Sequence, residues 1–282
     1  MRKMHQNSMV LFVFMLVLVL AAGCGNASET KADAKAGTGA DQSVSDAKQA
    51  PKVDLTISAA ASMTDALEEI KAAYEKAHPN VELNFNFGGS GALQKQIEQG
   101  APADLFLSAA AKNMKPLVNQ GLMAEGKEKT LLKNELVAVV PADSENPAGS
   151  IGDLGKAEVK RVAVGIPESV PAGNYAKEAL TNSKLWEPLQ PKLVQAKDVR
   201  QVLQYVETGN ADAGFVYKTD ALSSSKVKIA FTVDSSSYSP VEYPVGIVKA
   251  TKHAKEAEEF YEYLQSQASL DVFIKYGFSV PE

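Results

Sequence analysis

The stretch VDLTISAAASMTDALEEI, residues 53–70, predicts a β-strand that leads almost directly into a helix. Residues 53–60 form a mostly apolar run typical of a buried strand, and Met63 and Leu67 then recur at helical spacing. Ser62 lies where a helix N-cap belongs, because a serine oxygen there accepts a hydrogen bond from a free backbone N–H of the first turn. Two interpretations stay open at this point. Ser62 caps its own helix, or it presents its hydroxyl to a ligand.

Strand and helix signals continue to alternate after this unit. VELNFNF (81–87) alternates apolar and polar residues, a GGSG turn leads into the helical pattern ALQKQIEQ, and ADLFLSA (103–109) is a third strand. This βαβαβ order favours an α/β fold with a parallel sheet and right-handed crossovers. Further strands are expected at 135–141, 160–165, 192–196, 213–217, 227–233 and 241–249, with helices at 171–180, 198–209 and 254–267. They indicate a second α/β unit, followed by a tail that returns to the first.

The N-terminus carries the signature of a secreted protein. A basic, polar start is followed by 13 apolar residues, 10–22, whereas a bilayer-spanning helix needs about 20. We therefore predict a signal peptide over 1–23. The run ends in AAGC, which resembles the bacterial lipoprotein signal, in which the cysteine is lipidated and becomes the mature N-terminus. The alternative is a plain signal peptide with an incidental Cys24. Residues 24–51 would then be the lipidated cysteine and a disordered tether, because 25–51 hold one large aliphatic residue.

Composition narrows the function classes. Cys24 is the single cysteine, so internal disulfides are excluded and the core has to supply the stability. Loss of the signal peptide would leave 27 basic and 34 acidic residues, and such an acidic surface argues against nucleic acid as a partner. Beyond the signal, arginine occurs at Arg161 and Arg200 alone.

Catalytic patterns are weak in this sequence. His78 and His253 are the two histidines beyond the signal, and both lie in polar surroundings that favour a solvated surface position over a catalytic base or metal ligand. GGSGA (88–92) misses the G-x-S-x-G pattern at its last position and lacks the lysine of a phosphate-binding loop. No cluster has metal-ligand spacing. We expect a protein that is not an enzyme and uses no cofactor and no bare metal cation; a serine hydrolase using Ser90 is the alternative of a different class.

The expected helix starts are the richer signal. Ser62, Ser90, Ala172 and Val199 each lie at one of them. The first backbone N–H groups of a helix have no internal partner and carry the positive end of the helix dipole. Taken singly, each position is explained by capping or a tight turn. Several converging helix starts, however, would hold an anion without a single cation.

Long strings of the sequence resemble a known family. SAAASMTDAL, GAPADLFLSA, GIPESVPAGNYAKEAL, AKDVRQVLQYVETGNADAGFVYKTDA, VEYPVGIV and the closing YGF are similar to the molybdate-binding protein of bacterial molybdate ABC transporters, from about residue 53 to the C-terminus. The resemblance implies two α/β lobes of the periplasmic-binding-protein type, joined by hinge strands, with a tetrahedral oxyanion in the cleft between them. Carried over by motif, its ligand residues are Ser62 of AAAS, Ser90 of the glycine turn, Ala172 of VPAG, Val199 of KDVR and Tyr217 of GFVY.

These five residues offer hydrogen-bond donors without a cation. Ser62 and Ser90 each have a hydroxyl and a backbone N–H, whereas Ala172 and Val199 can contribute only their N–H groups. Tyr217, which alone would be taken for a core tyrosine, can add a phenol O–H. In this interpretation Ser62 turns its hydroxyl to the ligand, and Asp65 is left to cap the helix.

The resulting expectation is a lipid-anchored, monomeric, extracytoplasmic solute-binding protein. It would bind molybdate and tungstate and deliver them to an ABC permease. Lobe I is expected at 52–134 plus 243–282 and lobe II at 135–242, each with a mixed, mostly parallel sheet and helices on both faces. A receptor for another tetrahedral oxyanion, such as sulfate, is the alternative of the same kind.

Overall fold

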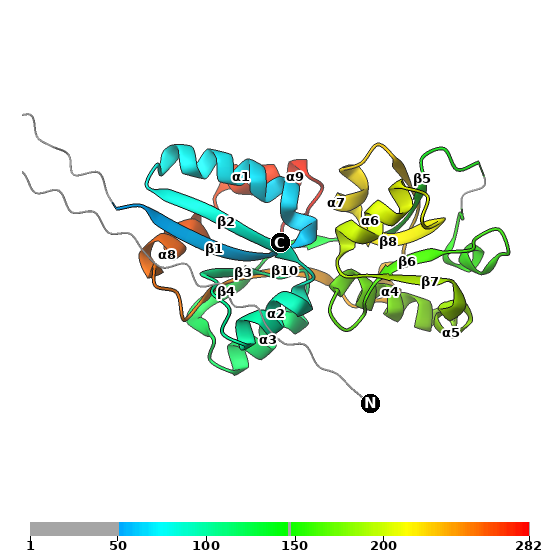
Figure 1. The fold of residues 1–282 in the computed structure, drawn as a ribbon, viewed down its shortest axis with the longest axis horizontal. Coiled ribbons are helices and arrows are strands. Elements are labelled where there is room, and N and C mark those ends of the chain that lie inside the picture. The colour runs from blue at the N-terminus through cyan, green and yellow to red at the C-terminus, as the bar shows by residue number, and fades with distance from the viewer. Residues whose placement is uncertain (1–50, 146–147, 282) are drawn as a thin grey trace, which may run out of the picture. The chain divides into compact units, whose positions relative to one another are not determined.

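Two five-stranded sheets organise the chain in the computed structural model, which describes residues 51–145 and 148–281 (Figure 1). The strand order is β2-β1-β3-β10-β4 in the first sheet and β7-β6-β8-β5-β9 in the second. The expected signal peptide, Cys24 and the tether up to residue 50 lie outside the described residues. Among the helices that are described, none has the length and apolar character to cross a membrane.

The first sheet begins with the strand-to-helix unit quoted above. β1 (Val53–Ala60), β2 (Val81–Gly88) and β3 (Leu105–Leu107) are parallel, and β10 (Val241–Val248) runs antiparallel to β3 and to β4 (Met123–Asn134). Helices lie on both faces of this sheet (Figure 1). They are α1 (Thr64–Ala77), α2 (Ser90–Glu98), α3 (Ala111–Asn119), α8 (Ala254–Tyr263) and α9 (Gln267–Lys275). We call this sheet and its helices lobe I.

The second sheet repeats the same plan. β6 (Val162–Gly165) is parallel to β7 (Leu193–Ala196) and β8 (Ala213–Tyr217), whereas β5 (Leu136–Pro141) is antiparallel to β8 and to β9 (Val227–Thr232). Its helices are α4 (Pro171–Asn182), α5 (Trp186–Leu189), α6 (Val199–Glu207) and α7 (Lys218–Leu222). We call this sheet and its helices lobe II. The expected two-lobed α/β architecture with mixed sheets is confirmed. In each sheet two of the four strand pairings are parallel and two are antiparallel.

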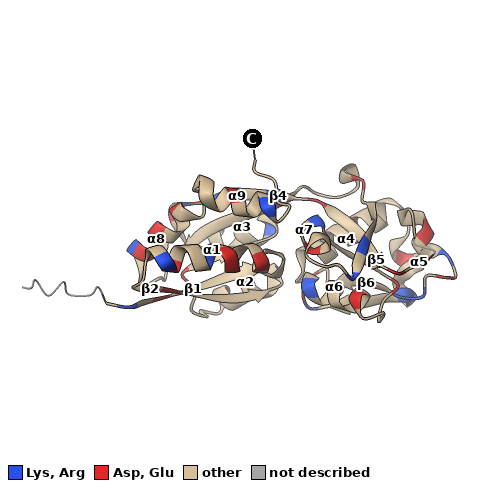
Figure 2. Ribbon diagram, turned by 90° about the horizontal axis from the view of Figure 1, so that it is seen from above, with Lys and Arg blue, Asp and Glu red and all other residues tan. Residues whose placement is uncertain are grey.

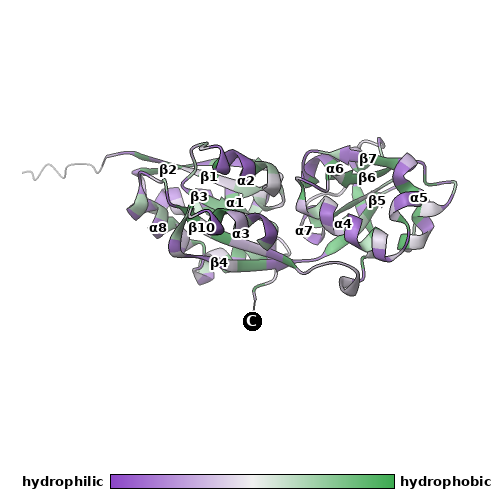
Figure 3. Ribbon diagram, turned by 90° about the horizontal axis from the view of Figure 1, so that it is seen from below, coloured by the Kyte–Doolittle hydropathy of each residue, from purple (hydrophilic) through white to green (hydrophobic). Residues whose placement is uncertain are grey.

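Each lobe buries an apolar core between its sheet and helices. Leu55, Ile57 and Leu105 of lobe I and Val162 and Phe215 of lobe II have no exposed surface. The strands are largely hydrophobic, whereas the helices carry both hydrophobic and hydrophilic residues (Figure 3). Acidic and basic residues are interspersed on the helices of both lobes (Figure 2). At about 25 cal/mol per Å² of apolar surface, this burial is the main stabilising contribution in a chain whose described residues contain no cysteine.

Four elements of lobe I differ from the sequence-based expectation. β4 was not predicted, because its sequence MAEGKEKTLLKN is dominated by charged and polar residues, as suits an edge strand whose one neighbouring strand in the sheet is β10. The helices α3 and α9 were also not predicted as separate elements. The third strand spans 105–107 rather than 103–109, since Asp104 instead accepts a hydrogen bond from the Thr56 N–H at 2.7 Å.

Candidate functional site

Ser62 lies at the carboxyl end of β1, but it does not cap the following helix. A 3₁₀ turn, Ala61–Met63, delays the start of α1 to Thr64, and neither the turn nor the helix has a side-chain cap. The buried Ser62 hydroxyl is instead 2.9 Å from the Tyr243 hydroxyl of β10. The expectation that Asp65 caps the helix is wrong, because its carboxylate pairs with Arg200 of lobe II at 2.5 Å. The capping interpretation of Ser62 is therefore excluded.

Ser90 is the first residue of α2, with Gly89 at the N-cap position. The Ser90 side chain is fully buried, and its oxygen accepts a hydrogen bond from the Ala109 N–H at 2.9 Å. This bond uses one of the two lone pairs of the oxygen, and the hydroxyl hydrogen of Ser90 remains available to donate to another group. Neither described histidine is hydrogen-bonded to Ser90. His78 is half-buried and stacked on Tyr74, and His253 is half-buried at the start of α8.

In lobe II, two helix starts present backbone donors. Ala172 is the second residue of α4, after Pro171 at the favoured first position. Val199 is the first residue of α6, which Asp198 caps by accepting from the Gln201 N–H at 2.8 Å. Both apolar side chains are buried in the lobe, so only N–H groups remain for a ligand.

Tyr217 ends β8 and is 1% exposed. Its hydroxyl has no hydrogen-bond partner within residues 51–145 and 148–281. Burial raises the pKa of Tyr217 well above 10, so the group stays a protonated donor at neutral pH. An unpaired buried hydroxyl costs about 1–3 kcal/mol, and a ligand oxygen at this point would remove that cost.

Contacts between the lobes bring these positions toward one another. The Gly91 N–H, next to Ser90, donates to the Ser169 carbonyl near the start of α4 at 2.9 Å. The Tyr175 hydroxyl of α4 donates to the Ala109 carbonyl at 3.3 Å. The ring of Tyr243, whose hydroxyl contacts Ser62, is 5.8 Å from that of Tyr217 in an edge-on arrangement. All five predicted residues therefore lie at the carboxyl ends of strands or in the helix starts that follow them, where ligands of α/β proteins bind.

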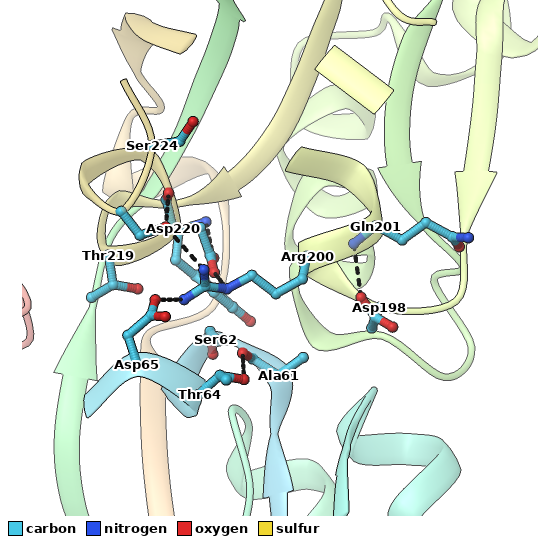
Figure 4. Close-up of polar contacts among 12 residues, drawn as sticks. Ala61, Ser62, Thr64, Asp65, Asp198, Arg200, Gln201, Thr219, Asp220 and Ser224 are labelled. Carbon is cyan, nitrogen blue, oxygen red and sulfur yellow. Dashed lines mark hydrogen bonds and ion pairs between the residues drawn. The ribbon is translucent and has the colours of Figure 1, made fainter. Parts of the chain in front are cut away.

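An ion-pair cluster that sequence reasoning missed borders this region. Figure 4 shows Arg200 between Asp65 of lobe I and Asp220 of α7. The Arg200 Nε lies 2.9 Å from the fully buried Asp220 carboxylate, which also accepts from the Tyr217 N–H at 3.1 Å. Burial raises the pKa of Asp220 to about 6, while Arg200 opposes that shift. The scarcity of arginine was the one sequence signal that could have singled out Arg200.

Other parts of the described chain are weaker candidates for a binding site. A groove of about 640 Å³ beside α4 is lined by Lys112, Lys177 and Glu178 among others, and by none of the five predicted residues. Within the described ranges, no group of three or more His, Cys, Asp and Glu side chains could hold a metal ion.

Comparisons with known proteins agree with this geometry. Residues 55–279 match the profile of a family described as bacterial extracellular solute-binding protein. The chain is 55% identical over 244 residues to the putative ABC transporter substrate-binding lipoprotein YvgL of Bacillus subtilis, covering 86% of this chain and 92% of that protein. It is 43% identical to the molybdate-binding protein ModA of Haemophilus influenzae, covering 82% and 91%.

A solved structure is similar along its whole length. The substrate-binding domain of a putative molybdenum ABC transporter from Clostridium difficile is 46% identical, with a TM-score of 0.63, and the match covers 82% of this chain and 100% of that one. The periplasmic molybdate-binding protein of Azotobacter vinelandii, at 24% identity and a TM-score of 0.74, shares the fold and covers 81% and 100%.

Proposed function

The chain belongs to the bacterial extracellular solute-binding protein family, and on that premise we propose that it captures molybdate and delivers it to an ABC permease. The proposed ligands are the hydroxyls of Ser62, Ser90 and Tyr217 and the N–H groups of Ala172 and Val199. The observation that carries this proposal is the buried Tyr217 hydroxyl, which lacks a partner in the described structure. Its ring is 5.8 Å from that of Tyr243, whose hydroxyl contacts Ser62 of lobe I. The action is binding and release, with no bond made or broken.

The donor set favours an anion that carries no hydrogen of its own. Near neutral pH molybdate, tungstate and sulfate are fully deprotonated, whereas phosphate keeps at least one hydrogen that needs an acceptor. The nearest carboxylates are engaged elsewhere, since Asp198 caps α6 and Asp65 and Asp220 pair with Arg200. A phosphate hydroxyl would therefore face donors and lose a hydrogen bond it has in water, at a cost of about 1–3 kcal/mol.

Titration calorimetry with the four anions tests the proposal. We expect tight binding of molybdate and tungstate, weak binding of sulfate, which is too small to reach every donor at once, and no detectable binding of phosphate. Sulfate binding tighter than molybdate would instead identify a sulfate receptor. Turnover of an ester substrate that is lost in Ser90→Ala would identify a hydrolase.

Closure of the two lobes around the anion is part of the proposal. We place lobe I at 52–134 plus 243–282 and lobe II at 135–242, with the crossings between them acting as hinges. A ligand shifts such an equilibrium only by its differential affinity for the two states, and donors from both lobes supply that difference. Small-angle scattering should show a more compact monomer when molybdate is added, and an unchanged profile would indicate a rigid pocket.

We also propose that Cys24 anchors the protein to the outer side of the cell membrane by a lipid. The AAGC sequence supports this, as does the similarity to a relative named as a substrate-binding lipoprotein. Cys24→Ser should release the protein into the medium or leave it unprocessed, with molybdate affinity unchanged. An unmodified Cys24 on the mature wild-type protein, found by mass spectrometry, would contradict the anchor.

A further inference from the structure

A chain of two hydrogen bonds connects Asn134, at the crossing between the lobes, to Ser62. Asn134 is the last residue of β4, directly before lobe II begins with β5. Its amide Nδ2 donates to the Tyr243 hydroxyl at 3.3 Å, and that hydroxyl lies 2.9 Å from the Ser62 hydroxyl. Asn134 Nδ2 also donates to the Thr219 hydroxyl of α7 at 3.0 Å, so the chain includes a contact between the lobes.

The direction of this chain is fixed at its outer end. The Glu135 N–H donates to Asn134 Oδ1 at 2.8 Å, and a backbone N–H cannot act as an acceptor. The amide oxygen of Asn134 is therefore turned to Glu135, and its NH₂ group, which has two hydrogens and only donates, is turned to Tyr243 and Thr219.

The same logic continues inward. The Tyr243 oxygen accepts from Asn134, so its own hydrogen is free for the Ser62 oxygen. Burial raises the pKa of Tyr243 well above 10, and the phenol therefore keeps that hydrogen. The 2.9 Å contact allows either hydroxyl to donate, and when the phenol donates this hydrogen, Ser62 Oγ is an acceptor toward Tyr243. Its own hydroxyl hydrogen remains for a group on the ligand side.

We propose that Asn134 and Tyr243 are positioning residues that orient the Ser62 hydroxyl so that its hydrogen points toward the bound anion. This inference rests on the proposed function and deepens it. A free serine hydroxyl can donate to an oxyanion or accept from a protonated one. With one of its two lone pairs engaged by Tyr243 and its hydrogen directed to the anion, Ser62 favours anions that only accept over anions that carry a hydrogen. Asn134 and Tyr243 act in this proposal through Ser62 and not as ligands.

A double-mutant cycle between Tyr243→Phe and Ser62→Ala tests the inference by calorimetry with molybdate. We expect Tyr243→Phe to weaken molybdate binding about tenfold in the wild-type background and less than twofold in the Ser62→Ala background. Tyr238→Phe is the matched control, because this buried tyrosine lies near the same crossing but its hydroxyl accepts from the Leu136 N–H at 3.1 Å. It should keep the wild-type affinity.

Selectivity provides a readout that a merely structural role would not move. In Tyr243→Phe the Ser62 oxygen is free to accept, so inorganic phosphate should compete with molybdate about tenfold better than in the wild type. Tyr238→Phe should leave that ratio unchanged.

Asn134→Asp reverses the chain with almost no change of shape. A carboxylate only accepts, so Tyr243 would donate outward, accept from Ser62 and draw the serine hydrogen away from the ligand. We expect a loss of molybdate affinity greater than tenfold. Because the variant also adds a negative charge, it is compared in the Ser62→Ala background, where an effect through Ser62 disappears and an effect of charge persists.

The outcomes separate the inference from the function beneath it. Equal losses in both backgrounds, or an unchanged phosphate-to-molybdate ratio, overturn the role of Asn134 and Tyr243 while leaving molybdate capture intact. A wild-type protein that does not bind molybdate overturns the proposed function itself. Thermal unfolding of the ligand-free variants establishes which are folded. If Tyr243→Phe is not folded, the Asn134→Asp cycle decides, since Asn134 is only half-buried.

Discussion

The two lobes share one strand order but differ in the hydrogen-bond donors that follow equivalent strands. β1 and β6 hold equivalent places next to the edge strands of their sheets, and the edge strands β2 and β7 also correspond. After β1 and β2, lobe I presents the side-chain hydroxyls of Ser62 and Ser90. After β6 and β7, lobe II presents the apolar residues Ala172 and Val199, whose only donors are backbone N–H groups.

This difference shows two ways of aiming a donor. A helix start directs its N–H groups by backbone geometry alone, so lobe II needs only well-packed helix ends. A hydroxyl rotates, so each serine of lobe I needs a second group to occupy its oxygen, and Tyr243 and the Ala109 N–H do so. We therefore expect lobe II to be sensitive to backbone changes and lobe I to side-chain changes.

The largest expected effect is on the packing of the lobe II helix start. A Cβ at Gly173 of α4 would lie 2.0 Å from the Gly165 carbonyl oxygen at the end of β6, and backbone atoms cannot yield cheaply. Overpacking usually costs 1–3 kcal/mol, and we expect Gly173→Ala to lower the free energy of unfolding by more than about 3 kcal/mol. Urea unfolding measures this, with Gly155→Ala as control because nothing lies within 4 Å of its Cβ. Equal stabilities of the two variants would refute this account of the helix start.

The second effect concerns the ion pair between Arg200 and Asp220, the residue that accepts a hydrogen bond from the Tyr217 N–H. Arg200→Met leaves the buried Asp220 carboxylate without its partner, and breaking such a pair costs about 3 kcal/mol at pH 7. Burial already raises the pKa of Asp220 to about 6, with Asp65 and Asp198 adding to the shift. The folded wild type therefore binds the extra proton between about pH 4 and pH 6, and this group's contribution to stability falls as pH rises through that window.

Arg200 is the one side chain that lowers the pKa of Asp220, so the pKa of Asp220 should rise further when Arg200 is lost. The cost of burying the Asp220 carboxylate is then felt only at higher pH, because at lower pH the group is protonated. The destabilisation by Arg200→Met should accordingly be smaller at pH 5 than at pH 7 in urea unfolding. Arg161→Met is the matched control, because Arg161 is exposed and bonds only to the Gly209 carbonyl through its side chain. A loss of equal size at both pH values would show that Asp220 is not the group left uncompensated.

Local signals were sufficient to predict most of the elements. β1, α4 and β8 begin and end within one or two residues of the predicted ranges, because apolar periodicity and a proline at the first helical position, Pro171, are local features. The five candidate ligands were named from helix starts and a family resemblance, and their role as ligands remains a proposal.

The partners of those ligands were beyond sequence reasoning. Tyr243 lies 181 residues from Ser62, and Arg200 lies 135 residues from Asp65. Such hydrogen bonds depend on how the sheets fold the chain back on itself, and no spacing in the sequence encodes them. The 3₁₀ turn at Ala61–Met63 was missed for a related reason, since its serine bonds to a distant tyrosine rather than to its own helix.

A third effect isolates a backbone donor of lobe II. Val199→Pro removes the N–H at the first position of α6, where proline is well tolerated and where Asp198 already has the extended conformation that precedes proline. A hydrogen bond to a charged ligand contributes roughly 1.5–3 kcal/mol, so molybdate affinity should fall about 10- to 150-fold. Val199→Ala keeps the N–H and should stay within about threefold in calorimetry. Ser62→Ala, by contrast, should lose as much as Val199→Pro. If Val199→Ala and Val199→Pro bind equally well, the N–H is not a ligand.

The smallest effect tests where the lobes meet. In this structure the three atoms nearest to a Cβ at Gly91 all belong to Ser169 of lobe II, the closest at 2.9 Å. Within α2 itself alanine is favoured over glycine by about 1 kcal/mol, so Gly91→Ala should leave ligand-free lobe I as stable as before or more so. Closure, however, would have to push the added methyl group against the Ser169 backbone, and a cost of about 1 kcal/mol corresponds to roughly fivefold weaker molybdate binding. Calorimetry and thermal unfolding of the same protein should therefore move in opposite directions, a pattern that a simple packing defect cannot produce. Unchanged molybdate affinity in Gly91→Ala would mean that the Gly91–Ser169 contact does not form in the ligand-bound state.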